Sequence, residues 1–222
     1  MLRFLLVFTY STWAFVSAEK GFEWAPFNDG DLNCLSSHYA FYMGTLRTPS
    51  NVPSPSDLQT LRNASARVLR VFAVIKPCYI IDCTPAEVYL SMIVQALNES
   101  GIEIKTLWLD VTERLPIYNM QANQQVITNF GNAAKKLNIE IGIRTVPDSW
   151  ASFVTKNWDG MAGFPLFLAE EKSFTPFGGW TKPRIRRIGR PAWPNYPTCT
   201  CGSRSYKYKC SYDPMQVYDD GL

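Results

Sequence analysis

The chain has 222 residues, of which 46% are hydrophobic and 18% are charged, so it can bury a full core as one domain. Its 22 basic and 19 acidic side chains nearly balance, which argues against nucleic acid as a main partner. The single histidine, His38, is interpreted as a surface or helix-end residue, which removes Ser-His-Asp and Cys-His catalysis. No glycine loop suited to phosphate is visible, so a nucleotide is not expected either.

Residues 1–18 have the pattern of a secretory signal. Arg3 precedes an apolar stretch, and the segment ends on the small residues Val16-Ser17-Ala18. A membrane anchor is the less favoured alternative, because the apolar stretch is short and is interrupted by polar residues. We therefore expect cleavage after about Ala18 and a secreted, extracellular chain of residues 19–222 without a membrane partner. Loss of Arg3 lowers the net charge from +3 to +2.

The cysteine count favours disulfide bonds over metal binding. An even number of cysteines in a secreted chain is typical of disulfides, and sequence alone does not choose their pairing. Cys78 and Cys83 are close enough to close a local loop. Zinc is the alternative raised by the close pair Cys199 and Cys201, but zinc ligands are normally spaced differently and a second pair or histidines are needed. We expect no metal and no cofactor, with disulfides formed by Cys34, Cys78, Cys83, Cys199, Cys201 and Cys210.

Two sequons fit a secreted chain. Asn63-Ala64-Ser65 and Asn98-Glu99-Ser100 each have the acceptor pattern for N-glycosylation, although such triplets also arise by chance. We therefore expect glycans at Asn63 and Asn98.

Strand-like runs alternate with helical segments along most of the chain, the pattern of parallel βα units. The longest turn-rich stretch is 48–57. We predict an α/β fold, a single-domain, irregular β/α (TIM-like) barrel, favoured over an open doubly wound sheet. The expected strands are 21–24, 39–45, 68–75, 104–110, 139–144 and 164–169, with a further candidate at 184–189.

Helical patterns are clearest in two places. In the first, Thr84 can cap the helix, Pro85 takes its first position, Glu87 completes a capping box and Gly101 ends it. The second covers 123–138 and carries an apolar stripe with a helical period. Both lead into predicted strands after short turns, as barrel units require.

The run "TLWLD" ends on Asp110, at the carboxyl end of a predicted strand, where β/α barrels carry their functional side chains. Alternation along a strand puts Trp108, Asp110 and Thr112 on one side and Glu113 on the other. Carboxylates at i and i+2 would provide an acid and a charge-stabilising partner for glycosidic cleavage. The second carboxylate is missing here.

Several segments together resemble the glycoside hydrolase family 25 lysozymes, in particular the secreted nematode members. Their order and spacing over about residues 21 to 218 carry the resemblance. It implies a barrel whose groove at the strand ends cuts the β-1,4 bond of bacterial peptidoglycan with acidic residues and no metal. The segments are "GFEW" at 21–24, "CL" at 34–35, "PCYIIDC" at 78–83, "LWLDV" at 107–111, "FPLFLA" at 164–169, "FTPFGGWTKP" at 174–183 and the late "CGS".

The resemblance implies catalytic positions that this sequence only partly fills. Glu23 stands where the family has its first acid, and Asp110 matches the middle aspartate. Thr112 replaces the glutamate that protonates the leaving oxygen, and a hydroxyl holds its proton too tightly for that step.

Further along the chain, Lys172 stands where the family has another aspartate, and Leu168 replaces a groove aromatic. Glu170 or Glu171 could compensate if the alignment shifts by one residue. Arg187 and Ile188 replace polar and aromatic residues of the next strand. We interpret this pattern as a lysozyme fold that has lost part of its catalytic machinery.

Three functions follow as hypotheses. The favoured one is a pseudoenzyme whose hydrolytic activity is lost or much reduced. It would be a secreted monomer that acts in innate immune defence by binding a glycan or another partner. The second is a slow peptidoglycan N-acetylmuramidase using Asp110 with Glu23 or with a carboxylate at 170–171. The third is a protein-interaction scaffold.

The expected partner of the favoured hypothesis is peptidoglycan or another anionic glycan. Lys172 and Arg187 would attract the anionic ligand if both face the groove. Trp108 and Trp180 could be sugar platforms, but we favour core positions for both.

Overall fold

The computed structural model describes residues 19–23, 32–33, 35–48, 52–67, 69–77, 83–112, 119–189 and 217–220. The predicted signal segment 1–18 lies outside these residues, as does Glu113. Five of the six cysteines also lie outside them: Cys34, Cys78, Cys199, Cys201 and Cys210.

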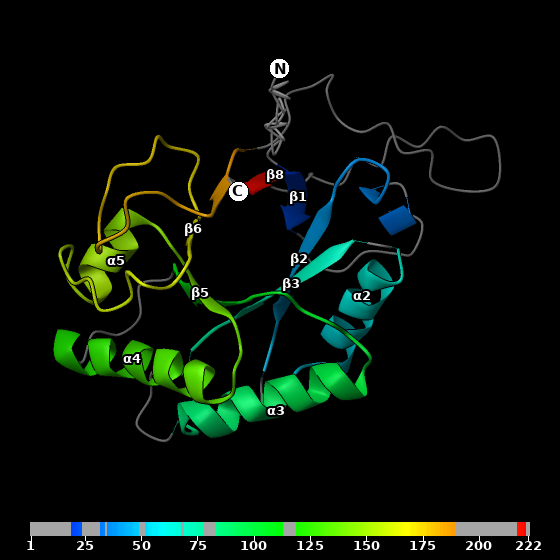
Figure 1. Cartoon of the computed structure of the whole chain (residues 1–222), viewed down its shortest axis with the longest axis horizontal. Coiled ribbons are helices and arrows are strands. Elements are labelled where there is room, and N and C mark those ends of the chain that lie inside the picture. Colours follow the sequence, from blue (N-terminus) through cyan, green and yellow to red (C-terminus); the bar gives the residue numbers. More distant parts are fainter. Residues whose placement is uncertain are drawn as a thin grey trace, which may run out of the picture.

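Strands and helices alternate through most of the described chain (Figure 1). The strands are β1 (Glu19–Glu23), β2 (Phe41–Leu46), β3 (Arg70–Ile75), β4 (Leu107–Val111), β5 (Ile141–Thr145), β6 (Leu166–Leu168), β7 (Ile185–Arg187) and β8 (Val217–Asp220). The helices are α2 (Pro55–Ser65), α3 (Ala86–Glu99), α4 (Met120–Lys136) and α5 (Pro147–Phe153). All seven predicted strands are confirmed to within a few residues at their ends, whereas β8 was not predicted.

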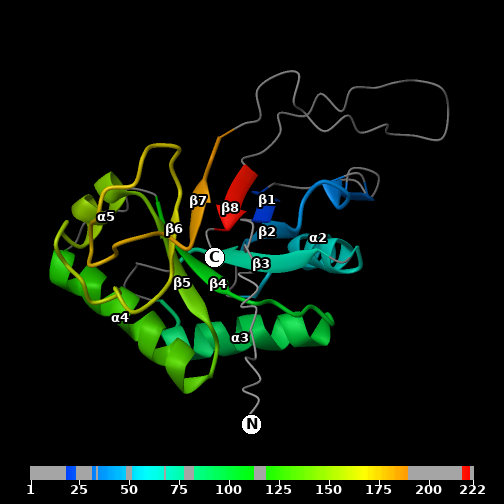
Figure 2. The ribbon, with the colours of Figure 1, turned by 45° about the horizontal axis from the view of Figure 1, so that its top comes forward.

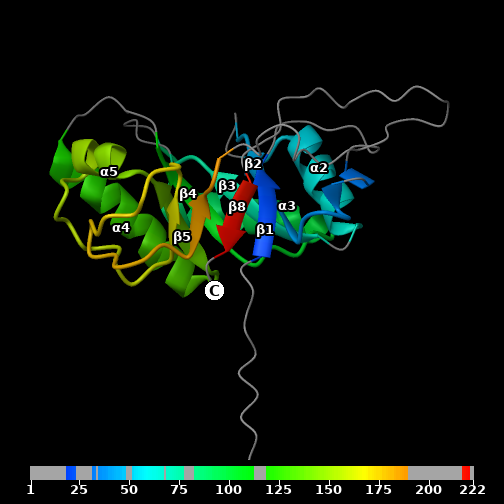
Figure 3. The same cartoon turned by 90° about the horizontal axis from the view of Figure 1, so that it is seen from above.

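The strands form a closed barrel in which each strand from β1 to β7 runs parallel to the next. The antiparallel strand β8 pairs with both β7 and β1 and closes the sheet. Figure 3 shows β1 and β8 side by side with opposite directions. The predicted irregular β/α barrel is therefore confirmed, and the open-sheet alternative is wrong.

Helices α2, α3 and α4 lie on the outside of the barrel (Figures 1 and 2). Helix α3 begins at Ala86, with Pro85 in the N-cap position and no side-chain cap. The predicted capping box of Thr84 is therefore wrong, because Pro85 keeps an extended ψ of 139° and remains outside the helix. Gly101 follows the helix end with a φ of +65°, a conformation that favours glycine. None of the described helices is both long enough and apolar enough to cross a bilayer.

The turn-rich stretch 48–57 contains the start of a helix that was not predicted. Ser54 is the N-cap residue of α2, and Pro55 occupies its first turn, where the missing N–H of proline costs nothing. Helix α4 also begins earlier than predicted, at Met120, because the Asn119 side chain accepts a hydrogen bond from the Gln121 N–H. His38 is exposed in a turn, as expected.

Two apolar clusters fill the structure. The larger lies between the strands and the surrounding helices and includes Trp180 and Leu168. The smaller fills the barrel. Gly142 leaves room there for the Trp108 ring, since a Cβ at this position would lie 2.4 Å from the ring. Trp108 and Trp180 are thus core residues. The barrel cluster consists of Phe41, Met43, Phe72, Val74, Trp108, Phe167 and Ile185.

Candidate functional site

Four charged side chains meet at the carboxyl end of the barrel strands. Two of them, Asp110 and Arg187, lie two residues beyond the barrel-interior residues Trp108 and Ile185. Side chains two apart on a strand share a face, so the polar residues form the layer above the apolar interior. The four are Glu23 at the end of β1, Asp110 in β4, Arg144 in β5 and Arg187 at the end of β7.

Asp110 and Arg144 are paired by the register of the sheet. Their Cα atoms are partners across β4 and β5, and Arg144 Nη1 lies 3.0 Å from Asp110 Oδ2. Their side chains are only 8% and 9% exposed. A charge pair removed from water to this degree is held in place, because separating it would leave an uncompensated buried charge.

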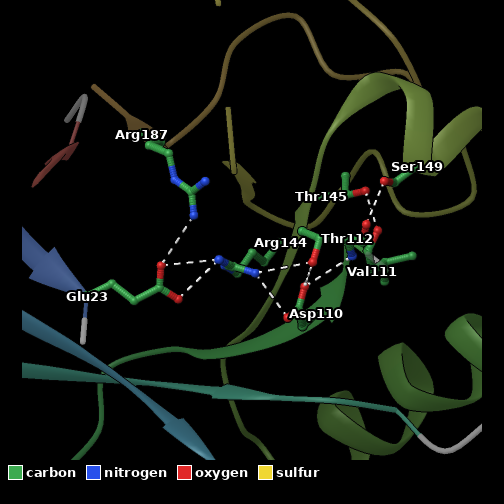
Figure 4. A network of polar contacts seen from close by, with 8 residues as sticks. All are labelled: Glu23, Asp110, Val111, Thr112, Arg144, Thr145, Ser149 and Arg187. Carbon is green, nitrogen blue, oxygen red and sulfur yellow. Dashed lines mark hydrogen bonds and ion pairs between the residues drawn. The ribbon is translucent and has the colours of Figure 1, made fainter. Parts of the chain in front are cut away.

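Arg144 also reaches across the barrel mouth to Glu23. Its Nη2 lies 3.1 Å from Glu23 Oε1 and 3.2 Å from Oε2, and the Glu23 side chain is 15% exposed. Arg187 Nη2 approaches the same carboxylate at 3.6 Å. Figure 4 shows Arg144 between the two acids. Two carboxylates and two guanidinium groups share this cluster, so their formal charges cancel. We call these four residues and Thr112 the Arg144 network.

Thr112 completes the network from the end of β4. Its hydroxyl donates to Asp110 Oδ1 at 2.7 Å, and its backbone N–H donates to the same oxygen at 3.1 Å. Arg144 Nη1 lies 3.4 Å from the Thr112 hydroxyl oxygen. Asp110 therefore accepts two hydrogen bonds from Thr112 in addition to its ion pair with Arg144.

Further hydrogen bonds beside the network fix the end of β4. The Ser149 hydroxyl donates to the Thr112 carbonyl at 2.7 Å, and the Thr145 hydroxyl donates to the Val111 carbonyl at 2.8 Å (Figure 4). The Arg144 guanidinium lies over the Phe167 ring at 5.3 Å, within cation–π range. Arg144 is thus held by the apolar layer beneath it as well as by the two acids.

Other residues singled out in the sequence do not join the network. The Lys172 side chain is 77% exposed, and its ion pair is with Glu170 at 3.6 Å. It lies just beyond β6, in an exposed segment. Glu171 is exposed and packs against Gly189. Leu168 points away from the barrel interior and is buried in the outer core. Neither glutamate replaces the missing acid within the network.

Among the residues that the structure describes here, the site offers acceptors and cations but no proton donor for a leaving group. The Thr112 hydroxyl already donates a hydrogen bond to Asp110, and the carboxylates of Glu23 and Asp110 are paired with the Arg144 guanidinium. Burial raises the pKa of the Tyr42 phenol well above its ordinary value, and the charges of Asp57 and Glu23 raise it further. Tyr42 is therefore too weak an acid to serve. Within the described ranges, no group of three or more His, Cys, Asp or Glu residues could hold a metal ion.

The sequence predicted Asp110 and Glu23 as site residues, and the structure brings them together through Arg144, which was not predicted. A signal for it was present. Arg144 ends the run "IEIGIR" just as Asp110 ends "TLWLD", so the same strand-end rule applies to both.

The two sequon asparagines lie in the last turns of α2 and α3, on the outside of the barrel (Figure 1). Cys83 is disulfide-bonded, and its partner lies outside the described residues. Asn63 is half-buried in α2 and its side-chain oxygen accepts a hydrogen bond from Gln59. Asn98 is exposed in the last turn of α3.

A family model described as lysozyme-like protein 1 matches residues 24–187. The chain is similar to lysozyme-like protein 5 of Caenorhabditis elegans, with 24% identity over 186 residues that cover 80% of this chain and 84% of that protein.

Solved structures share the fold. The Clostridium perfringens spore cortex lytic enzyme SleM has a TM-score of 0.67 at 12% identity, over 91% of this chain and 67% of that one. A family GH25 lysozyme from Aspergillus fumigatus has a TM-score of 0.58 at 14% identity, over 93% and 95% of the two chains.

Proposed function

Because the chain belongs to the lysozyme-like protein 1 family, we propose that it is a lysozyme-like protein that binds peptidoglycan without cleaving it. Membership confirms the family expected from the sequence, and the barrel is the fold of the family 25 muramidases. The observation that carries the proposal is the Arg144 network, in which one guanidinium pairs with both acids that the family pattern retains.

Loss of hydrolysis follows from the chemistry of glycosidic cleavage. A retaining or inverting glycosidase needs a carboxylic acid that protonates the leaving oxygen, and general acid catalysis contributes about 10²–10⁴ in rate. Thr112 stands at that position. Arg144 adds a second obstacle, because Glu23 and Asp110 are engaged by its guanidinium and would have to exchange that partner for a substrate.

A protein can keep glycan binding after it has lost cleavage, because glycan affinity is spread over a surface while bond breaking depends on one or two acids. The support for peptidoglycan is the family itself, together with fold likeness to a lysozyme. The signal-like residues 1–18 support secretion. A secreted monomer that recognises bacterial walls would act in innate immune defence, which is the role we propose.

The charge balance of the network indicates which kind of ligand the site would bind. Arg187 does reach the site, but it meets Glu23, and the two guanidinium groups offset the two carboxylates. An anionic ligand therefore gains little from this cluster. We propose that the ligand is the glycan strand of peptidoglycan, held by hydrogen bonds from the exposed edge of Arg187 and by non-ionic contacts.

Sedimentation with insoluble peptidoglycan tests the proposal, with turbidity of a cell-wall suspension followed in parallel. We expect depletion of the protein from the supernatant and no loss of turbidity. Arg187→Ala should weaken depletion, since its side chain is at the barrel mouth and 21% exposed. Arg186→Ala is the matched control, because this neighbouring residue faces the opposite side of β7 and is exposed.

Each other hypothesis has its own outcome in the same experiment. Steady turbidity loss would show a slow muramidase. If the protein were not depleted from the supernatant, the interaction-scaffold hypothesis would be favoured. Equal weakening by the two arginine variants would place binding away from the barrel mouth.

A further inference from the structure

A shallow depression lies on the outer face of the molecule, between α3 and the segment that follows α4. Its volume is about 330 Å³. Three aliphatic side chains, Val94, Leu137 and Ile139, form its apolar part, and all three are only partly buried. Ile139 precedes β5 and α3 leads into β4, so the depression lies toward the amino ends of the strands. It is therefore on the other side of the barrel from the Arg144 network. Its polar lining residues are Ser91, Gln95, Asn98 and Glu99.

Asn98 is both a lining residue of the depression and the asparagine of a sequon, Asn98-Glu99-Ser100. It is exposed in the last turn of α3. The neighbouring Gly101 ends the helix in open space, since a Cβ added there would meet no atom within 4 Å. Asn98 is itself exposed, so a bulky group on it has room at its point of attachment.

Asn63, the other sequon asparagine, has a different environment. It is half-buried, its side-chain oxygen accepts from Gln59 at 2.7 Å, and its carbonyl accepts from Arg67 at 2.6 Å. A glycan there would disturb these contacts of α2.

We propose that Asn98 carries an N-linked glycan whose first N-acetylglucosamine packs into this depression. A pyranose ring has an apolar C–H face and a polar edge, which match the aliphatic floor and the amide and carboxylate of Gln95 and Glu99. Covering the floor removes apolar surface from water and stabilises the fold. The inference rests on the proposed secretory route, but not on the proposed peptidoglycan binding.

The modification needs the secretory pathway's own sugar donor, an oligosaccharide linked through a diphosphate to a lipid. The Asn98 amide nitrogen forms a bond to C1 of the first sugar as the bond from C1 to the diphosphate oxygen breaks. The amide loses one proton, and the lipid diphosphate leaves with the bonding electrons. No oxidant or reductant is required.

The test is expression of the full-length chain in a secretory eukaryotic host, followed by mass spectrometry of glycopeptides. We expect a glycan on Asn98. Secreted protein with Asn98 unmodified would overturn the proposal. Retention of the chain inside the cell with residues 1–18 uncleaved would overturn the secretory route and this proposal together, while leaving peptidoglycan binding of purified protein to be judged on its own.

Thermal unfolding of trimmed protein tests the packing of the first sugar. An endoglycosidase that leaves one N-acetylglucosamine should keep Tm unchanged, whereas an amidase that removes the whole glycan should lower Tm by about 2–4 °C. The amidase converts Asn98 to aspartate, so Asn98→Asp and Ser100→Ala proteins are the controls and should match the amidase-treated protein. An equal Tm after both treatments would show that the first sugar does not occupy the depression.

Discussion

Arg144 faces Asp110 across β4 and β5, with Nη1 3.0 Å from Oδ2, while its Nη2 lies 3.1 Å from Glu23 on the far side of the barrel mouth. One guanidinium therefore occupies the space between two acids that a lysozyme would direct at its substrate. Thr112 stands in place of a glutamate, and Arg144 pairs with both of the remaining acids. The strand register sets this relationship, since Asp110 and Arg144 are Cα partners.

Removing the cation should destabilise the fold. Arg144→Met leaves Glu23 and Asp110 as neighbouring carboxylates that are mostly buried and lack their shared partner. Breaking a buried ion pair by deleting one side costs about 3–5 kcal/mol. We expect a fall of this size in the free energy of unfolding, measured by urea denaturation.

Arg186→Met is the matched control for that change. It removes the same group from an exposed position on β7, where substitutions usually change stability by less than about 0.5 kcal/mol. If the two variants had the same free energy of unfolding, the Arg144 ion pairs would not contribute to stability.

Thr112→Glu alone should not restore hydrolysis. The new carboxylate would enter a site where Arg144 Nη1 already lies 3.4 Å from the Thr112 oxygen, so it would pair with that guanidinium and would not remain available as an acid. Groups that act as a unit are also strongly non-additive in catalysis. The measurement is turbidity loss of a cell-wall suspension by the variant. Strong lysis would show that Thr112 is the only defect.

The sequence predicted the barrel well because its parallel strands are short apolar runs bounded by turns, a signal that is local. Strand β8 was missed because its "VYDD" sequence is half acidic and its place is set by pairing with β1 and β7. Helix α2 was missed because Pro55, a good first residue for a helix, sits among other turn-forming residues.

The sequence predicted the two acids of the candidate site and its second cation, Arg187, but not its central cation, Arg144. The family pattern directs attention to carboxylates, so Arg144 was passed over although it ends a predicted strand. Its contacts with Glu23 and Asp110 depend on which strands are neighbours and on their register, and neither can be read from the spacing of residues along the chain.

Thr155 should be a site of easily gained stability. Its φ is +90°, a conformation that is costly for a β-branched residue, and its side chain is exposed. Thr155→Gly should raise the free energy of unfolding by about 1 kcal/mol, partly offset by the greater freedom of glycine in the unfolded chain. Thr155→Ala keeps a Cβ and should gain less. Equal gains by both would show that backbone strain is not the cause.

Thiol labelling tests the disulfide expectation. Cys83 is disulfide-bonded in the structure, and the even cysteine count predicts that the other five residues are bonded as well. Non-reducing mass mapping of the secreted protein should find no labelled cysteine. Labelling of two or more before reduction would argue against three bridges.

The charge balance of the network predicts weak salt dependence of glycan binding. Interactions between opposite net charges are screened by salt, while hydrogen bonds and non-ionic contacts are much less so. Sedimentation with peptidoglycan should therefore change little between low and high ionic strength. Loss of binding at high salt would point to exposed lysines such as Lys172 as the binding surface, and a Lys172→Ala variant would then reproduce that loss at low salt.

The most direct test of the central claim is the appearance of new reducing ends in peptidoglycan incubated with the purified protein, followed over time from acidic to neutral pH. We expect no increase above a buffer blank, because Thr112 supplies no transferable proton and Arg144 engages both Glu23 and Asp110. A steady release of reducing ends that disappears in an Asp110→Asn variant would contradict this account and show that the protein is a working muramidase.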